Sequence, residues 1–373
     1  MTSPVTWEQV AIDGAARRGR LHTPHGSVET PAFMPVGTRG VVRAVDADDL
    51  TEVGAQIVLA NTYHLMLRPG ASQVAALGGL HRFAGWDRPI LTDSGGYQIY
   101  SLDPVIDEEG AVFRSTYDGS EVRLTPEDAV AVQELLGPDI AMVLDVCVGL
   151  PAPRKVVRAA MERTLRWTER AIAVHRRADQ ALFGIVQGGV DPELRQESAR
   201  RTADLGLPGF GIGGLSVGEE PDERDRALEA VTAELPSDKV RYVMGLGDAE
   251  GILAAIARGV DLFDCVWPTR LARHGRVLTP DGDYNLRRAE YAADPAPLDS
   301  DCPCRACRKY SRAYLRHLLM VGEMTALRLV TLHNLTYTFG LVAGARTAVE
   351  EGRFADYRAE VVERRIRRGD AER

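Results

Sequence analysis

The sequence predicts an α/β protein built on a closed (β/α)8 barrel of the TIM type, with an inserted or C-terminal zinc-binding subdomain. Short apolar segments alternate with amphipathic helical segments over more than 200 residues, which is typical of a parallel sheet. About seven or eight such apolar segments are present, and this number favours a closed barrel over an open sheet. The glycine fingerprint of an open dinucleotide-binding sheet is also missing, since Gly211-Ile212-Gly213-Gly214 is followed by Ser216 where that pattern requires glycine.

The elements follow one another in a regular order. Residues 1–30, with turns at Asp13-Gly14 and His25-Gly26, predict an N-terminal β element, and residues 31–290 predict the catalytic barrel. The expected barrel strands are 31–36, 55–60, 89–98, 139–145, 181–189, 210–215, 239–244 and 259–264. The expected helices are 126–136, with Thr125 as its cap, 154–175, 192–205, 221–235 and 248–257. Hairpins are expected at 112–125 and 276–285, a zinc-binding subdomain at 291–345, and a C-terminal helix at 346–373.

The charge and the termini limit the class of protein. A formal charge of −8 argues against indiscriminate binding of nucleic acid, which needs a broadly positive face, although a local basic patch remains possible. The N-terminus has no basic start followed by an apolar core, so no secretory signal is expected, and no apolar stretch approaches the length that spans a membrane. We therefore expect a cytoplasmic protein that does not enter a membrane.

Three cysteines form the strongest local motif. Cys302, Cys304 and Cys307 fall within six positions, a spacing that suits a metal better than a disulfide framework. A histidine would complete a tetrahedral Cys3His zinc site of the structural kind, and the spacing allows either His317 or His333. The alternative is a loop with unpaired cysteines.

Polar residues end several of the expected strands. Because the carboxyl ends of all strands in a barrel open into one mouth, the residues that end these strands should surround a single pocket. They are Asp93, Asp145, Gln187, Gly214 and Asp264. A single acid there is more often a helix cap or an ion-pair partner, but three acids with a glutamine favour chemistry. Two carboxylates suit double displacement at a sugar carbon, while Asp145 and Gln187 suit the edge of a planar, amide-like ligand on which Tyr97 stacks.

A basic run follows Asp264 at residues 269–276, and further basic residues lie beside the cysteines. This pattern predicts a phosphate-binding surface near the expected catalytic acid. The alternative is a solvated face whose charges pair with local acids.

Five segments together closely resemble bacterial tRNA-guanine transglycosylase, also called queuine tRNA-ribosyltransferase. They are 93–98 (DSGGYQ), 183–189 (FGIVQGG), 213–219 (GGLSVGE), 242–247 (YVMGLG) and 263–270 (FDCVWPTR). The resemblance extends in unbroken order from about Gly14 to His333. It implies a zinc-containing barrel enzyme, usually a homodimer, that exchanges the wobble guanine of GUN-anticodon tRNAs in queuosine biosynthesis.

The resemblance also implies a role for each matching residue. Asp264 would be the nucleophile at ribose C1′ and Asp93 the general acid/base. The expected base-binding residues are Ser94, Gly95, Gly96, Tyr97, Asp145, Cys147, Gln187, Gly214, Leu215, Glu219 and Met244. Contacts with the anticodon loop are expected from Gly245, Leu246, Gly247, Asp248, Ala249, Glu250, Gly251, Thr269, Arg270, Leu271, Ala272 and Arg273. Cys302, Cys304, Cys307 and His333 match the ligands of one structural Zn²⁺ per chain, which selects His333 over His317.

The incoming base is expected to be 7-aminomethyl-7-deazaguanine, because Cys147, Val217 and Glu219 match the bacterial pattern. One position departs from it: many bacterial members have a glutamate after the aspartate of the base pocket, and this chain has Val146. That carboxylate is therefore missing as a support for the backbone near Leu215 and Ser216. Two other classes compete. A catalytically silent tRNA-binding subunit would not need both Asp93 and Asp264, and a barrel metallohydrolase would need histidines at the strand ends.

Overall fold

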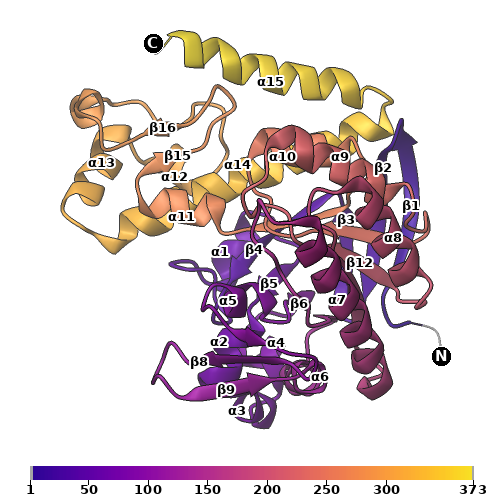
Figure 1. The fold of residues 1–373 in the computed structure, drawn as a ribbon. Coiled ribbons are helices and arrows are strands. Elements are labelled where there is room, and N and C mark those ends of the chain that lie inside the picture. The colour runs from indigo at the N-terminus through magenta and orange to yellow at the C-terminus, as the bar shows by residue number, and fades with distance from the viewer. Residues whose placement is uncertain (1–2, 372–373) are drawn as a thin grey trace.

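The computed structural model describes residues 3–371, and its centre is a closed barrel of eight parallel strands (Figure 1). This confirms the predicted fold class. In sequence order the barrel strands are β4 (Ala32–Gly37), β5 (Val58–Ala60), β6 (Ile90–Thr92), β10 (Ile140–Met142), β11 (Ala181–Val186), β12 (Gly209–Ile212), β13 (Val240–Val243) and β14 (Leu262–Cys265). The last strand pairs with the first, with Asp264 opposite Met34, and this pairing closes the barrel.

The strand expected at 89–98 is shorter than predicted. It ends at Thr92, and Tyr97 and Gln98 belong instead to the short helix α5 (Gly96–Tyr100). Gly95 has a φ of 87°, a backbone conformation that glycine adopts without strain, and it turns the chain from the strand into this helix. The turn places Asp93 and Tyr97 at the same end of the barrel.

The helices that follow the later barrel strands agree closely with the sequence pattern. They are α6 (Pro126–Leu136), α7 (Arg154–Val174), α8 (Pro192–Ala203), α9 (Pro221–Thr232) and α10 (Ala249–Ile256), whereas α11 (Trp267–Arg273) was not predicted as a helix. Thr125 caps α6 as predicted, in a reciprocal capping box with Asp128. The run that begins at Thr269 is mostly helical, because α11 continues to Arg273. The earlier helices are short: α1 (Ala47–Glu52), α2 (Thr62–Leu67), α3 (Ala71–Ala76) and α4 (Gly79–Ala84).

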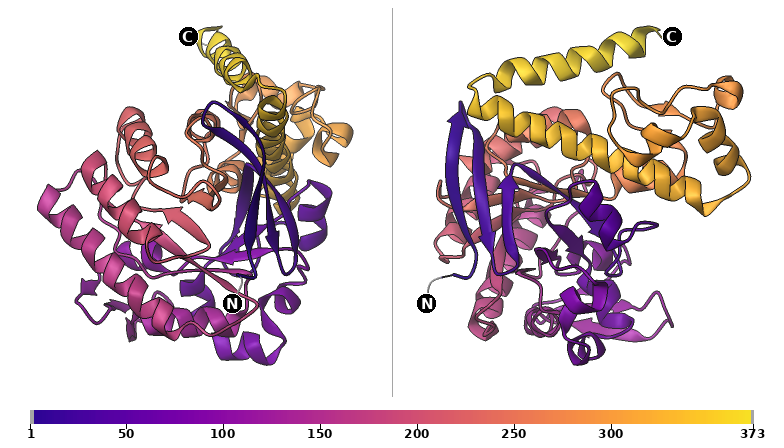
Figure 2. Two further views of the ribbon diagram at one scale, coloured as in Figure 1. Left: turned by 90° about the vertical axis from the view of Figure 1, so that its right-hand side faces the viewer. Right: turned by 180° about the vertical axis from the view of Figure 1, so that it is seen from behind.

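An antiparallel sheet covers the amino-terminal end of the barrel. It consists of β1 (Thr6–Asp13), β2 (Ala16–Thr23) and β3 (Gly26–Thr30), and in the left view of Figure 2 these indigo strands lie in front of the barrel. Arg17 on β2 pairs with the buried Asp261, which immediately precedes β14. In the turn after β2, His25 Nδ1 lies 2.8 Å from Asp139 Oδ1, next to the start of β10, and stacks on the ring of His81.

A second antiparallel sheet is inserted between α5 and α6. It contains β7 (Val105–Ile106), β8 (Ala111–Arg114) and β9 (Glu121–Leu124), and the last two form the hairpin predicted around Asp118-Gly119. Tyr63 on α2 holds the tip of this hairpin, since its hydroxyl lies 3.1 Å from both the backbone nitrogen and Oγ1 of Thr116.

The C-terminal region forms a subdomain and then returns to the barrel. Its elements are β15 (Arg276–Val277), β16 (Tyr284–Asn285), the 3-10 helix η1 (Ala289–Ala293), α12 (Arg305–Lys309), α13 (Arg312–Met320), α14 (Met324–Glu350) and α15 (Phe354–Ala371). The boundary expected after residue 345 falls inside α14, and the break between the last two helices lies instead at residues 351–353. Residues 1–2 and 372–373, which belong to the expected terminal elements, lie outside the described residues. The long α14 packs on α11, β4 and the N-terminal sheet (Figure 1). In the part of the chain that the structure describes, no helix is long and apolar enough to cross a membrane.

Candidate active site

A cavity of about 310 Å³ opens at the carboxyl ends of the barrel strands. Residues from seven of the eight strand ends line it, and they include Asn61, His64, Asp93, Ser94, Gly96, Tyr97, Asp145, Cys147, Gly214, Leu215, Met244, Gly245 and Asp264. The structure thus brings the three expected acids into one pocket, although they are far apart in the sequence. Gln187 is buried behind this lining and contacts Asp145.

Asp264 is held by one of its two oxygens. Tyr242 Oη donates to Oδ1 at 2.6 Å, and the backbone nitrogen of Gly245 donates to the same oxygen at 2.8 Å. The other oxygen, Oδ2, receives no hydrogen bond from the residues that the structure describes. Burial raises the pKa of Asp264, while the two hydrogen bonds oppose that rise. The result is an oriented carboxylate with one free oxygen facing the cavity, as a nucleophile requires.

Asp93 has a different environment. Asn61 Nδ2 donates to Oδ2, while the backbone nitrogens of Thr62 and Gly95 donate to Oδ1 at 2.9 and 3.2 Å. Burial raises the pKa of Asp93 to about 6, and the nearby Asp264 contributes to the rise. A carboxyl group with this pKa exchanges protons readily near neutral pH, which suits a general acid/base.

Asp145 and Gln187 form a joined polar surface. Gln187 Nε2 donates to Asp145 Oδ2 at 2.6 Å, and burial raises the pKa of Asp145 to about 6. The glycines around the pair are required for space: a Cβ on Gly214 would lie 2.2 Å from Gln187 Oε1, and one on Gly96 would lie 2.4 Å from Asp145 Oδ1. Tyr97, with 58% of its surface exposed, stands at the cavity mouth. The arrangement presents a carboxylate, an amide and an aromatic face to a planar ligand.

Glu219 supports the backbone near Leu215 and Ser216, which Val146 has no carboxylate to support. Its carboxylate accepts hydrogen bonds from the backbone nitrogens of Ser216 and Val217. Ser216 has a φ of 61°, a left-handed conformation that is uncommon outside glycine and that these hydrogen bonds help to hold. The side chain of Val146 is buried in an apolar cluster with Leu144 and Trp167. Glu219 therefore holds the backbone nitrogens of Ser216 and Val217, and the Leu150 backbone nitrogen donates to the Val217 oxygen at 3.3 Å.

Two supporting residues were missed by the sequence analysis. The Tyr242 hydroxyl donates a hydrogen bond to Asp264, although the position of Tyr242 within an apolar strand predicts only a core aromatic residue. Arg195 is fully buried, and its guanidinium donates to the backbone oxygens of Gly189, Val186 and Gly214. The only signal for Arg195 is its position on the buried face of α8.

The segments expected to contact the anticodon loop are only partly at the surface. Gly245, Asp248, Glu250 and Arg270 are exposed, and Leu271 and Arg273 are partly exposed. The remaining expected contacts are buried: Leu246, Gly247, Ala249, Gly251, Thr269 and Ala272. Asp248 caps α10 by accepting a hydrogen bond from the backbone nitrogen of Gly251. Buried members of these segments can only shape the surface that the exposed members form.

The predicted metal ligands come together in the C-terminal subdomain. Ligand atoms of Cys302, Cys304, Cys307 and His333 all lie within 4.8 Å of one another. His333 Nδ1 lies 3.8 Å from Cys304 Sγ and 3.2 Å from Cys307 Sγ, while its Nε2 is 2.8 Å from the backbone oxygen of Leu278. An Nε2–H bonded to that carbonyl leaves the Nδ1 lone pair directed at the thiols, as metal-binding histidines require. The four side chains thus form a candidate metal site.

Comparison with known proteins identifies one family. The family model described as queuine tRNA-ribosyltransferase matches residues 13–367. A protein of that name from Thermus thermophilus is 51% identical over 367 residues, covering 98% of this chain and 95% of the relative. Proteins of the same name from Herpetosiphon aurantiacus and Moorella thermoacetica are each 52% identical, over 347 and 351 residues, covering 92% and 94% of this chain and 88% and 94% of the relatives.

Proposed function

Because this chain belongs to the queuine tRNA-ribosyltransferase family and is a tRNA-guanine transglycosylase, we propose that it exchanges the wobble guanine of GUN-anticodon tRNAs for 7-aminomethyl-7-deazaguanine. The observation that carries the proposal is the pair of acids in one cavity. Asp264 has a free, oriented oxygen, and Asp93 beside it has a pKa of about 6. These are the two groups that double displacement at a sugar carbon needs.

The proposed reaction has two balanced steps at ribose C1′. Asp264 Oδ2 attacks C1′, the bond from C1′ to guanine N9 breaks with its electron pair going to the base, and Asp93 supplies a proton to the departing base. The incoming base then attacks the same carbon, loses its N9 proton to Asp93 and displaces Asp264. Two inversions give net retention, and the exchange needs neither a redox cofactor nor nucleotide hydrolysis.

Several contacts support an aminomethyl-bearing base. We assign Asp145, Gln187 and the Gly214 amide to the edge of a guanine-like ring, and Tyr97 and Met244 to its faces; the Gln187–Asp145 contact and the cavity lining support this assignment. The Ser216 backbone nitrogen donates to Glu219, and in a trans peptide this directs the Leu215 carbonyl away from Glu219. Leu215 lines the cavity, so its carbonyl is a suitable acceptor for a protonated amine.

The Cys3His cluster fits Zn²⁺. Three thiols and one imidazole are the usual donors of a closed structural zinc site, and hydrogen bonds with Cys302 and Cys307 hold the pKa of Cys304 well below its usual range. Zinc bound there would stabilise the C-terminal subdomain and take no part in the exchange. We assign one Zn²⁺ per chain to Cys302, Cys304, Cys307 and His333.

The proposed partners are the anticodon loop of tRNA and a second copy of the chain. The family supports a tRNA substrate, with the exposed parts of the 245–251 and 269–273 segments as its contacts. A homodimer is supported by large apolar side chains that are exposed at the end of α13 and the start of α14, namely Met320, Val321 and Met324.

Incorporation of labelled guanine into a GUN-anticodon tRNA tests the function. The wild-type protein should incorporate label, Asp264→Asn should incorporate none, and a tRNA without guanine at the wobble position should remain unlabelled. Absence of uptake by the wild type, or full uptake by Asp264→Asn, would overturn the assignment. Competition of labelled guanine against 7-aminomethyl-7-deazaguanine and queuine then tests the base preference, which is wrong if queuine competes better.

A further inference from the structure

Arginines follow three neighbouring barrel strands at the cavity mouth. The strands β14, β4 and β5 are adjacent in the barrel, and each leads at its carboxyl end into a segment with exposed or partly exposed arginines. We call these residues the basic arc: Arg270 and Arg273 after β14, Arg39 and Arg43 after β4, and Arg68 after β5 and α2. Adjacent strands lie about 4.8 Å apart, so the arc spans roughly 10 Å along one side of the mouth.

The basic arc is not neutralised by the protein. Many exposed arginines elsewhere pair with acids, as Arg154 does with Asp191 and Arg166 with Glu108. Among the side chains that the structure describes, no member of the arc has an ion pair with a carboxylate. Burial and the nearby positive charges of Arg43 and Arg270 lower the pKa of Arg273. Uncompensated cations beside a cavity in a chain of net charge −8 indicate an anionic ligand.

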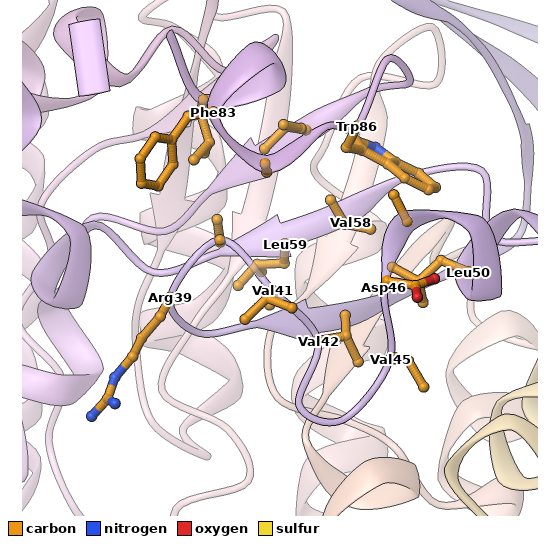
Figure 3. A pocket seen from close by; sticks show the side chains of 17 residues that line it. Arg39, Val41, Val42, Val45, Asp46, Leu50, Val58, Leu59, Phe83 and Trp86 are labelled. Carbon is orange, nitrogen blue, oxygen red and sulfur yellow. The ribbon is translucent and has the colours of Figure 1, made fainter. Parts of the chain in front are cut away.

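The loop after β4 is built to direct its arginines outward. Val42 and Val45 are buried, and they line an apolar pocket of about 290 Å³ beside α4 (Figure 3). Arg39 lies at the edge of this pocket, and Figure 3 shows its guanidinium end directed away from the apolar side chains. The apolar anchors hold the loop against the barrel, and Arg39 and Arg43 remain exposed.

Tyr117, at the tip of the β8–β9 hairpin, joins two members of the arc to the active-site cavity. The guanidinium carbons of Arg39 and Arg68 lie 5.6 and 4.8 Å from the centroid of its ring, within the range of cation–π attraction. The Tyr117 hydroxyl lies 3.1 Å from His64 Nδ1, and His64 lines the cavity. Tyr117 therefore holds two like charges together next to the reacting site.

We propose that the basic arc binds consecutive phosphates of the RNA strand that flanks the exchanged nucleotide, with Tyr117 as a positioning residue for Arg39 and Arg68. The inference rests on the proposed tRNA substrate and extends its contact surface to residues 39, 43, 68 and 117, beyond the 245–251 and 269–273 segments. An extended polyanion fits better than a single phosphate, because the arc crosses three strands of the barrel.

Salt-dependent binding and exchange kinetics test the proposal. Binding of a GUN anticodon stem-loop is measured by fluorescence anisotropy over a range of salt concentrations, together with KM and kcat for guanine exchange. Arg39→Gln and Arg68→Gln should each raise Kd and KM for the RNA about fivefold and reduce the slope of log Kd against log salt by about 0.7. The KM for guanine and kcat should change less than about twofold, because neither arginine contacts the base.

Tyr117 and a distant arginine provide the matched comparisons. Tyr117→Leu removes the ring and should weaken RNA binding about as much as one arginine variant, whereas Tyr117→Phe keeps the ring and should change Kd less than about twofold. Arg226→Gln, an exposed position on α9, should leave Kd and the salt slope unchanged. Thermal melting of each variant checks that it is folded.

The outcomes separate this inference from the proposed function. If the wild type exchanges guanine but the double variant Arg39→Gln/Arg68→Gln has wild-type Kd, KM and salt slope, the proposal that the basic arc binds RNA is overturned. A loss of kcat without a change in salt slope would also overturn it, because that pattern indicates a structural role. If the wild type binds the stem-loop but exchanges no guanine, the proposed reaction fails, and the salt slopes still decide whether the arc binds RNA.

Discussion

Asp93, Asp145 and Asp264 face one cavity, and burial raises the pKa of all three. In the unfolded chain these carboxyl groups return to their ordinary values near 4. The folded state therefore binds protons more tightly than the unfolded state, so the stability that these groups contribute is present at low pH and is lost as the pH rises through their folded pKa. These three buried carboxyl groups therefore lower the free energy of unfolding near neutral pH.

Asp145→Asn tests this loss of stability and keeps the local hydrogen bond, because an asparagine oxygen can still accept from Gln187. The pKa of Asp145 is about 6, so the window in which folding loses this stability is roughly pH 4 to 6. We expect the variant to melt about 2 to 4 °C above the wild type at pH 7.5, with no difference near pH 4. Thermal denaturation across that range measures it. A difference that stays constant with pH would show that the charge is not the cause.

The residues that sequence reasoning could find are those whose role follows from position on a strand. Asp93 and Asp264 were predicted to lie together because the carboxyl ends of parallel strands share one end of the barrel, and both line one cavity, while their chemical roles stay predictions. Tyr242 was not, because its contact with Asp264 depends on the register that places Tyr242 opposite Leu262. Such a register is a property of the closed barrel, and no local pattern contains it.

At the scale of elements, the sequence was most informative where end signals and periodicity agree. The helix at 126–136 was predicted to the residue, since Thr125, a first-turn proline and a closing glycine mark both ends. Strand ends were less well predicted. After β10, Leu144, Val146 and Cys147 are buried although they lie outside the strand, because the chain lines the cavity before it reaches the next helix. Helices α2 to α5 have five or six residues each, too few to show a helical period.

The C-terminal subdomain with its proposed zinc site can be tested as an element. It has its own apolar cluster, which includes Cys304, Leu315 and Val330, so its fold and its metal should depend on each other. Cys304→Ala should lose bound zinc and unfold at a lower temperature than the wild type. Cys147→Ala, which alters a cysteine in the active-site cavity, should retain zinc. Metal analysis of the purified variants decides the question, and an unchanged zinc content in Cys304→Ala would refute the assigned site.

At the scale of the whole molecule, the two ends of the barrel have separate tasks. The carboxyl end carries the cavity and the basic arc, and the amino end is closed by the N-terminal sheet. Arg17 secures this closure: it pairs with the buried Asp261 and donates to the backbone oxygens of Ser237 and Lys239 beside β13. Changes at this end should therefore affect stability and leave the chemistry intact, as in other barrel enzymes.

Asp261→Asn tests this division. The asparagine can still accept the hydrogen bond from the Arg241 backbone nitrogen, but Arg17 becomes a buried cation without its carboxylate partner. Removal of one member of a buried ion pair costs about 3 to 5 kcal/mol. We expect a loss of that size in the free energy of unfolding, measured by urea denaturation, with kcat unchanged while the protein stays folded.

The double variant Arg17→Met/Asp261→Asn removes the stranded charge as well. A methionine occupies much of the arginine stem's volume without its charge, so the double variant should recover at least half of the lost stability. If it is as unstable as Asp261→Asn alone, the closure depends on the hydrogen bonds from Arg17 to Ser237 and Lys239 rather than on charge balance. A fall in kcat in either folded variant would instead show that the amino end of the barrel influences the cavity at the other end, and would overturn the division of tasks.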